Sequence, residues 1–139
     1  LPALRLGWAY ASEALIDILN RVRSPFNVNS PALAAGIAAM EDQSYIAQMR
    51  TRNAHERIRV ANAFAAAGFT VVPSVTNFIL VHCGTRTPAV NAHLAAHGLI
   101  VREVAGYGLA EYLRVSIGTE EENTLLIEAL QALKHAGAA

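Results

Sequence analysis

Three arginines of this chain lie in mainly apolar segments, where a permanent positive charge needs an explanation. Arg5 lies in the run LPALRLGWAY, Arg102 lies at the end of a predicted strand, and Arg114 is flanked by apolar residues in YLRVSIG. An arginine cannot lose its charge, so a buried one requires a carboxylate, a phosphate or several carbonyl groups as partners. The planar guanidinium group can bind either anion through two parallel hydrogen bonds. Because strand residues alternate between two faces, each arginine could instead face water, and both interpretations remain open.

The histidines and the single cysteine are weaker candidates for chemistry. His93 and His97 are four residues apart on a predicted helix and share a face, but two imidazoles need a third or fourth ligand to hold a metal. His82 and Cys83 are adjacent at the end of a predicted strand, so their side chains point to opposite faces and are poorly arranged as base and nucleophile. We therefore predict no metal site.

The composition excludes several classes of protein. With 53% hydrophobic and 16% charged residues, the chain of 139 residues is not expected to be disordered. No apolar run approaches the roughly 18 residues of a membrane-spanning helix, and Arg5 interrupts the only candidate for a signal peptide. Eleven basic and eleven acidic residues cancel, which argues against nucleic-acid binding. The single Cys83 excludes an internal disulfide and fits a reducing compartment, so we expect a cytoplasmic protein.

The first half of the chain is predicted to be mostly helical. Alternating apolar residues predict a strand over residues 4–11, followed by a short helix that Ser12 caps. Ser30 followed by Pro31 indicates the start of a long helical segment that stops at Gly68. Because this segment is long for one helix, we expect a break over residues 41–43, where Asp42 can cap a second helix.

The second half is predicted to be a small sheet with helices. The pattern predicts strands over residues 69–72, 77–82, 99–102 and 112–117, and helices over 87–98 and 120–135. Thr119 and Glu122 fit a capping box at the start of the last helix. The order β-β-α-β-β-α predicts a sheet covered on one face by two helices, an α+β arrangement. We divide the chain into a strand and helix over residues 1–26, a helical connector over 27–68 and a small domain over 69–139.

Four segments, taken in order, carry a family resemblance: LPALRLGWAY, PFNVNSPALAAGIAAMED, PSVTNFILV and GLIVREVAGYGLAEYLRVSIGTEEEN. They resemble the carboxyl-terminal part of the fold-type I aminotransferases that use pyridoxal 5′-phosphate, in the histidinol-phosphate aminotransferase branch. The last segment resembles the closing motif of that family, V-R followed by L-R-x-S/T-x-G-T-x-E-E-N. The resemblance covers essentially the whole chain. It implies an α/β fold in which a long interdomain helix precedes a small domain, a β-sheet covered by helices.

The resemblance also implies roles for individual residues. Arg5 matches the arginine that pairs with the cofactor phosphate, in what would be a remnant of the large cofactor-binding domain. Arg114 matches the arginine that receives the acidic group of the substrate, and Arg102 matches a second arginine that helps to hold the substrate phosphate. The family's Schiff-base lysine would lie four residues before Leu1, and Lys134, the only lysine here, does not match it. The resemblance therefore implies no catalytic residue in this chain and an inactive isolated polypeptide.

The implied function is the carboxyl-terminal part of an enzyme of histidine biosynthesis. That enzyme converts histidinol phosphate and 2-oxoglutarate to imidazole acetol phosphate and glutamate. The alternatives are an aromatic aminotransferase, a phospho-amino-acid decarboxylase of the same fold, or a non-catalytic binding or dimerisation module. The expected partners are a phosphorylated amino alcohol or amino acid, the missing amino-terminal large domain and a second copy in a homodimer, with no nucleic acid and no membrane.

Overall fold

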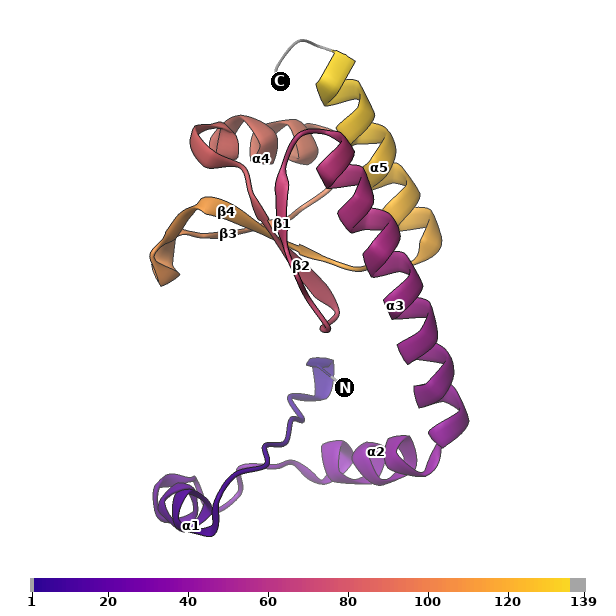
Figure 1. Ribbon diagram of the computed structural model, residues 1–139. Helices are drawn as coiled ribbons and strands as arrows, with labels where there is room; N and C mark the ends of the chain where they lie inside the picture. The colour runs from indigo at the N-terminus through magenta and orange to yellow at the C-terminus, as the bar shows by residue number, and fades with distance from the viewer. Residues whose placement is uncertain (1, 136–139) are drawn as a thin grey trace. The chain divides into compact units, whose positions relative to one another are not determined.

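The computed structural model describes residues 2–135, and the chain forms two compact units, Leu1–Gln48 and Met49–Ala139. The first unit contains a short 3-10 helix η1 (Pro2–Leu4), helix α1 (Glu13–Val22) and helix α2 (Ser30–Glu41). Helix α3 (Gln43–Ala66) begins in the first unit and continues into the second (Figure 1). The three-part division predicted from the sequence is a finer one and stays a prediction.

The helices of the first unit begin close to the predicted residues. Ser12 occupies the N-cap position of α1, although its side chain makes no capping hydrogen bond. For α2 the prediction was wrong by one residue: the cap is Asn29, whose Oδ1 accepts a hydrogen bond from the Ala32 N–H at 2.8 Å, and Ser30 is already helical. The predicted break is confirmed, because Asp42 separates α2 from α3 and its Oδ1 accepts a hydrogen bond from the Tyr45 N–H at 3.0 Å.

The strand predicted over residues 4–11 is wrong. This segment contains the end of η1, a turn at Arg5 and irregular backbone from Leu6 onward. A strand exists only where a neighbouring strand satisfies its N–H and C=O groups, and no strand is described before Thr70. The alternation of apolar residues therefore does not produce a strand here, because the described residues of the first unit include no strand with which this segment could pair.

The second unit is built on a four-stranded antiparallel sheet in the order β1-β2-β4-β3. The strands are β1 (Thr70–Val72), β2 (Phe78–His82), β3 (Arg102–Val104) and β4 (Leu109–Ser116). Short 3-10 helices precede α4 (η2, Gly84–Arg86) and link β3 to β4 (η3, Ala105–Tyr107). The sheet predicted from the sequence is thus confirmed in its number of strands and in their order along the chain.

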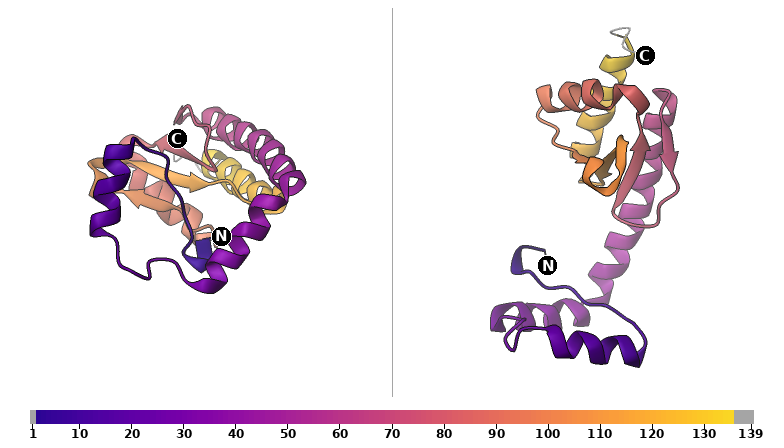
Figure 2. Two further views of the ribbon diagram at one scale, coloured as in Figure 1. Left: turned by 90° about the horizontal axis from the view of Figure 1, so that it is seen from below. Right: turned by 90° about the vertical axis from the view of Figure 1, so that its left-hand side faces the viewer.

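Helices α3, α4 (Thr87–Ala96) and α5 (Glu120–His135) contribute the helical side of the core of this unit (Figures 1 and 2). Their fully buried side chains include Phe64, Leu94 and Leu130, which pack with Ile79 of β2 and Leu113 of β4. One face of the sheet is therefore covered by three helices rather than the predicted two. The end of α3 takes part because its apolar residues continue into the core. No helix within residues 2–135 is long and apolar enough to cross a membrane.

The third strand begins later than predicted. Gly98 adopts a φ of 75° after α4, and the Leu99 N–H donates to the Leu94 carbonyl at 3.0 Å, so these residues close the helix. Strand pairing begins only at Arg102, which opens β3 instead of ending it. The predicted capping box is confirmed: the Thr119 N–H donates to Glu122 Oε2 at 2.7 Å, and the Glu122 N–H donates to Thr119 Oγ1 at 3.2 Å.

Candidate anion-binding site

The register of the sheet places Arg102 of β3 directly opposite Arg114 of β4. Along β4, Leu113 and Val115 point into the core, so Arg114 between them belongs to the other face of the sheet. Like charges that face each other across a strand pair are destabilising unless an anion or carboxylate neutralises them. The register therefore matters, because it places two arginines opposite each other on one face of the sheet, an arrangement that the sequence prediction did not contain.

The guanidinium group of Arg114 is half-buried and incompletely satisfied. Its Cζ lies 5.3 Å from the centre of the Phe78 ring, so the cation packs against an aromatic side chain of β2. Its Nε is buried and has no hydrogen-bond partner among the described residues. A buried donor without a partner costs about 1–3 kcal/mol. An anion that approached this guanidinium group would remove that cost.

A polar hollow of about 480 Å³ lies beside the two arginines. Its lining residues are Asn91, Ile100, Val101, Arg102, Glu103, Arg114 and Ser116. Ser116 is exposed and lies two residues after Arg114, on the same face of β4. Glu103 does not neutralise the arginines in a described ion pair, since its Oε1 accepts a hydrogen bond from Asn91 Nδ2 at 2.8 Å. The hollow is within the size range of small-molecule sites.

Arg5 lies in the first unit, whereas Arg102 and Arg114 lie in the second. It is exposed, it occupies the turn after η1, and its φ is 58°. Positive φ is uncommon for residues other than glycine and is found mainly where the surroundings over-determine the backbone, as at ligand sites. The structure thus brings together two of the predicted site residues, Arg102 and Arg114. The convergence of Arg5 with them stays a prediction.

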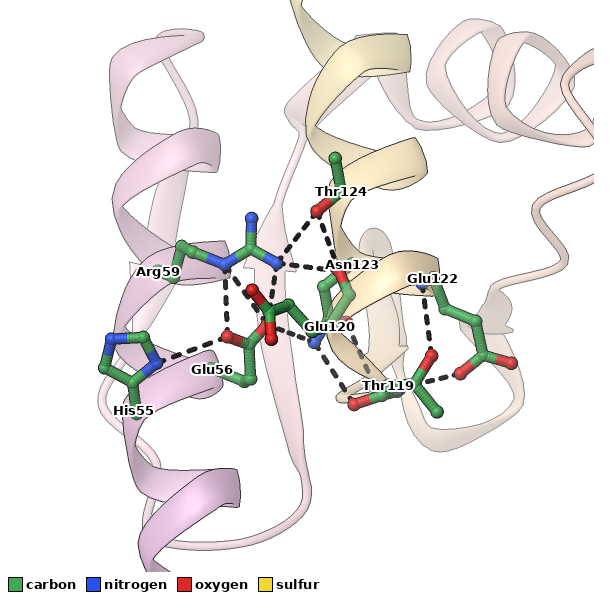
Figure 3. Close-up of polar contacts among 9 residues, drawn as sticks. His55, Glu56, Arg59, Thr119, Glu120, Glu122, Asn123 and Thr124 are labelled. Atoms are coloured by element: carbon green, nitrogen blue, oxygen red, sulfur yellow. Dashed lines mark hydrogen bonds and ion pairs between the residues drawn. The ribbon is translucent and has the colours of Figure 1, made fainter.

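A buried polar network joins α3 to the start of α5 (Figure 3). Glu56 of α3 is only 3% exposed, and its Oε2 accepts hydrogen bonds from Arg59 Nη2 and from Asn123 Nδ2, each at 2.8 Å. The hydrogen bond from Arg59 outweighs the opposing effect of burial, and with Asn123 it lowers the pKa of Glu56 from 4.5 to about 2. His55 Nδ1 lies 3.2 Å from the other carboxylate oxygen.

Asn123 connects this network to the end of β4. Its Oδ1 accepts a hydrogen bond from the Gly118 N–H at 3.0 Å, and its Nδ2 donates to the Gly118 carbonyl at 3.2 Å as well as to Glu56. Neither Glu56 nor Asn123 was predicted from the sequence to belong to such a network. A glutamate among charged helix residues resembles a solvated side chain, and the TEEE run was interpreted as a cap and as part of the family's closing motif, with no role for the asparagine. The one available signal was an asparagine directly after that run.

The remaining candidates do not form a site. His93 Nε2 lies 2.8 Å from the Ala129 carbonyl oxygen, and the ring centres of His93 and His97 are 4.5 Å apart. Among the described residues, no group of three or more His, Cys, Asp and Glu side chains is arranged to hold a metal. Burial raises the pKa of the Cys83 thiol to about 11, which makes a nucleophilic role unfavourable.

Comparisons with known proteins give the family. Residues 1–130 match the family model described as aminotransferase class I and II. The chain is 48% identical over 134 residues to the histidinol-phosphate aminotransferase of Granulibacter bethesdensis, covering 95% of this chain and 36% of that protein. It is also 48% identical over 130 residues to histidinol-phosphate aminotransferase 2 of Pseudomonas aeruginosa, covering 94% of this chain and 35% of that protein. The chain therefore spans just over a third of the length of these curated relatives.

A solved structure agrees with this assignment. The histidinol-phosphate aminotransferase of Sinorhizobium meliloti, in complex with pyridoxal 5′-phosphate, superposes with a TM-score of 0.72 at 29% identity, covering 88% of this chain and 34% of that one. The predicted fold class, a part of a fold-type I pyridoxal-phosphate-dependent transferase, is thereby confirmed. We conclude that this chain belongs to the class I and II aminotransferase family.

Proposed function

We propose that this chain is the carboxyl-terminal part of a histidinol-phosphate aminotransferase, which transfers the amino group of histidinol phosphate to 2-oxoglutarate. The observation that carries the proposal is the facing pair of Arg102 and Arg114 beside a polar hollow. The names of the relatives support the same substrate. The chain's own contribution is to bind and orient the substrate through its phosphate.

The charge of the site favours a phosphate over a carboxylate. A phosphate monoester carries about −1.5 to −2 charges at neutral pH and offers three acceptor oxygens. Two guanidinium groups match that charge, and their forks can engage several oxygens at once. A lone carboxylate would neutralise only one of them and leave the repulsion between Arg102 and Arg114 in place. This difference argues against an aromatic amino acid as the preferred substrate.

The cofactor implied by the family is pyridoxal 5′-phosphate, which supplies the electron sink for the reaction when it is bound. In this chain the residue suited to its phosphate is Arg5, because its side chain is exposed and its backbone is held in an unusual turn. The only lysine of the sequence is Lys134, in the last helix, so this chain does not offer the family's cofactor-binding lysine. We therefore propose that the 139-residue chain alone has no transaminase activity.

The first unit supports a larger assembly. The side chains of Trp8, Tyr10 and Phe26 are 87%, 94% and 96% exposed. Trp8 also lines an apolar hollow with Leu33 and Met40, whose side chains are exposed as well, so this unit presents a contiguous apolar surface of the kind that a partner covers. We propose that the missing large domain and a second copy of the enzyme cover it, and that the enzyme is cytoplasmic.

The test uses the complete enzyme, in which this chain follows the large domain. We expect R102A and R114A each to raise the KM for histidinol phosphate by about 10- to 100-fold, since a hydrogen bond to a charged group contributes about 1.5–3 kcal/mol. R102K and R114K keep the positive charge but lose the planar guanidinium group that donates two parallel hydrogen bonds. Their KM values should therefore lie between those of the alanine variants and the wild-type enzyme. Unchanged KM values in R102A and R114A would refute the substrate assignment.

Three outcomes would favour the alternatives. Faster turnover of phenylalanine than of histidinol phosphate would indicate an aromatic aminotransferase, and release of carbon dioxide from a phospho-amino acid would indicate a decarboxylase. Absence of any turnover by the complete protein, with phosphate binding retained, would indicate a non-catalytic binding module.

A further inference from the structure

The end of the sheet that carries Arg114 is held by one face of α3. Asn53 Nδ2 and Arg57 Nη1 both donate to the Thr76 carbonyl at 3.1 Å, in the turn that leads into β2. One helical turn from Asn53, Glu56 holds Asn123, which in turn binds both backbone groups of Gly118 after β4. The two segments that flank the last rung of the β2–β4 pair are therefore tied to the same helix.

This rung contains Ser116, which lies two residues after Arg114 on β4 and lines the same polar hollow. Phe78, which packs against the guanidinium of Arg114, is the register partner of Ser116. The Ile117 N–H donates to the Asn77 carbonyl at 2.9 Å and closes the sheet at this end. Arg114 has no hydrogen bond at Nε to orient it, so its position depends on the backbone of β4 and on the Phe78 ring.

Burial of the Glu56 carboxylate in this network costs desolvation free energy, so the network is expected to serve a purpose beyond holding two helices together. A carboxylate that is 3% exposed loses most of its hydration, and removal of one partner from such a buried pair is strongly destabilising. An apolar contact between α3 and α5 would hold the helices together without that cost. A polar network, in contrast, accepts only one arrangement of donors and acceptors, so it can fix the Gly118 backbone in a single position.

We propose that Asn123, anchored by Glu56, is a positioning residue for substrate binding: by holding Gly118 at the end of β4, it fixes where Arg114 and Ser116 meet the substrate anion. This inference rests on the proposed function, because it assumes that the anion binds at Arg114. Asn123 acts through the backbone and does not itself touch the substrate.

The first test is N123A in the complete enzyme, with inorganic phosphate as the probe. The variant loses both bonds to Gly118, so we expect the dissociation constant for phosphate and the KM for histidinol phosphate to rise about tenfold, since a displacement of about 1 Å can cost up to about a hundredfold. The kcat should stay within about twofold, because binding rather than chemistry is affected.

The variants N123D and E56Q/N123D supply a second test, which also applies if N123A does not fold. N123D keeps the shape of the side chain but brings two carboxylates together where Asn123 Nδ2 now lies 2.8 Å from Glu56 Oε2. We expect N123D to weaken phosphate binding as N123A does. In E56Q/N123D the amide and the acid exchange places. The new amide on α3 can then donate to the new carboxylate on α5, which can still accept from the Gly118 N–H. The new carboxylate cannot donate to the Gly118 carbonyl, and the new amide on α3 faces the Arg59 guanidinium, so this double variant should recover only part of the affinity.

The matched control is H93A. His93 joins α4 to α5 through the Ala129 carbonyl, away from the network around Gly118, Asn123 and Glu56. H93A should lower the Tm of the enzyme while leaving the phosphate dissociation constant within twofold of the wild-type value. Equal weakening by H93A, unchanged affinity in folded N123A or N123D, or weaker phosphate binding in the double variant than in N123D would overturn the positioning role. If R114A itself leaves phosphate binding unchanged, the proposed function fails instead.

Discussion

Replacement of Glu56 by glutamine should remove a defined part of the acid sensitivity of this protein. The Arg59 guanidinium and the Asn123 amide stabilise the Glu56 carboxylate and lower its pKa from 4.5 to about 2. A carboxylate whose pKa is lower in the folded state contributes stability above its unfolded pKa, and that stability is lost as the pH falls through the folded pKa. For this shift the full contribution is about 3 kcal/mol, of which about 2 kcal/mol is lost between pH 6 and pH 3.

The assay is urea unfolding of the wild-type protein and E56Q at pH 6, 4 and 3, followed by circular dichroism. E56Q should be less stable than the wild-type protein at pH 6, and the difference in unfolding free energy should shrink by about 2 kcal/mol at pH 3. E128Q, at an exposed glutamate of α5, is the control and should parallel the wild-type protein. If the difference between E56Q and the wild-type protein is the same at pH 6 and pH 3, the buried ion pair does not act as described.

Two further predictions concern the core of the second unit. Burial raises the pKa of the Cys83 thiol to about 11. At pH 8 the thiol should therefore react with a disulfide reagent much more slowly in the folded protein than in urea. Equal reaction rates would contradict the burial of Cys83. The side chain of Leu94 is 0% exposed, whereas that of Ile100 is 85% exposed. In urea unfolding, L94A should therefore lower the free energy of unfolding by about 2–5 kcal/mol and I100A by less than about 0.5 kcal/mol. Similar losses in the two variants would contradict the assigned core.

Much of the fold could be predicted from local signals. The capping box at Thr119, the break at Asp42 and the order of the strands depend on neighbouring residues or on short periodicities, and all are confirmed. The errors had two causes, the lack of a distant partner strand and helix ends that differ from those predicted. Residues 4–11 alternate like a strand, but the described residues of the first unit include no strand that could pair with them. Strand β3 starts at Arg102 because the exit from α4 extends through Leu99.

The sequence by itself determined the family and the α+β order of the second half, and it singled out the two arginines that we propose to bind the anion, because residue types, spacing and helix caps are properties of the local chain. Only the tertiary structure decided that Arg102 faces Arg114 and that Glu56 meets Asn123, which lies 67 residues further along the chain. Strand register and the satisfaction of a buried charge depend on which distant backbone and side chains come into contact, and no local pattern encodes those contacts.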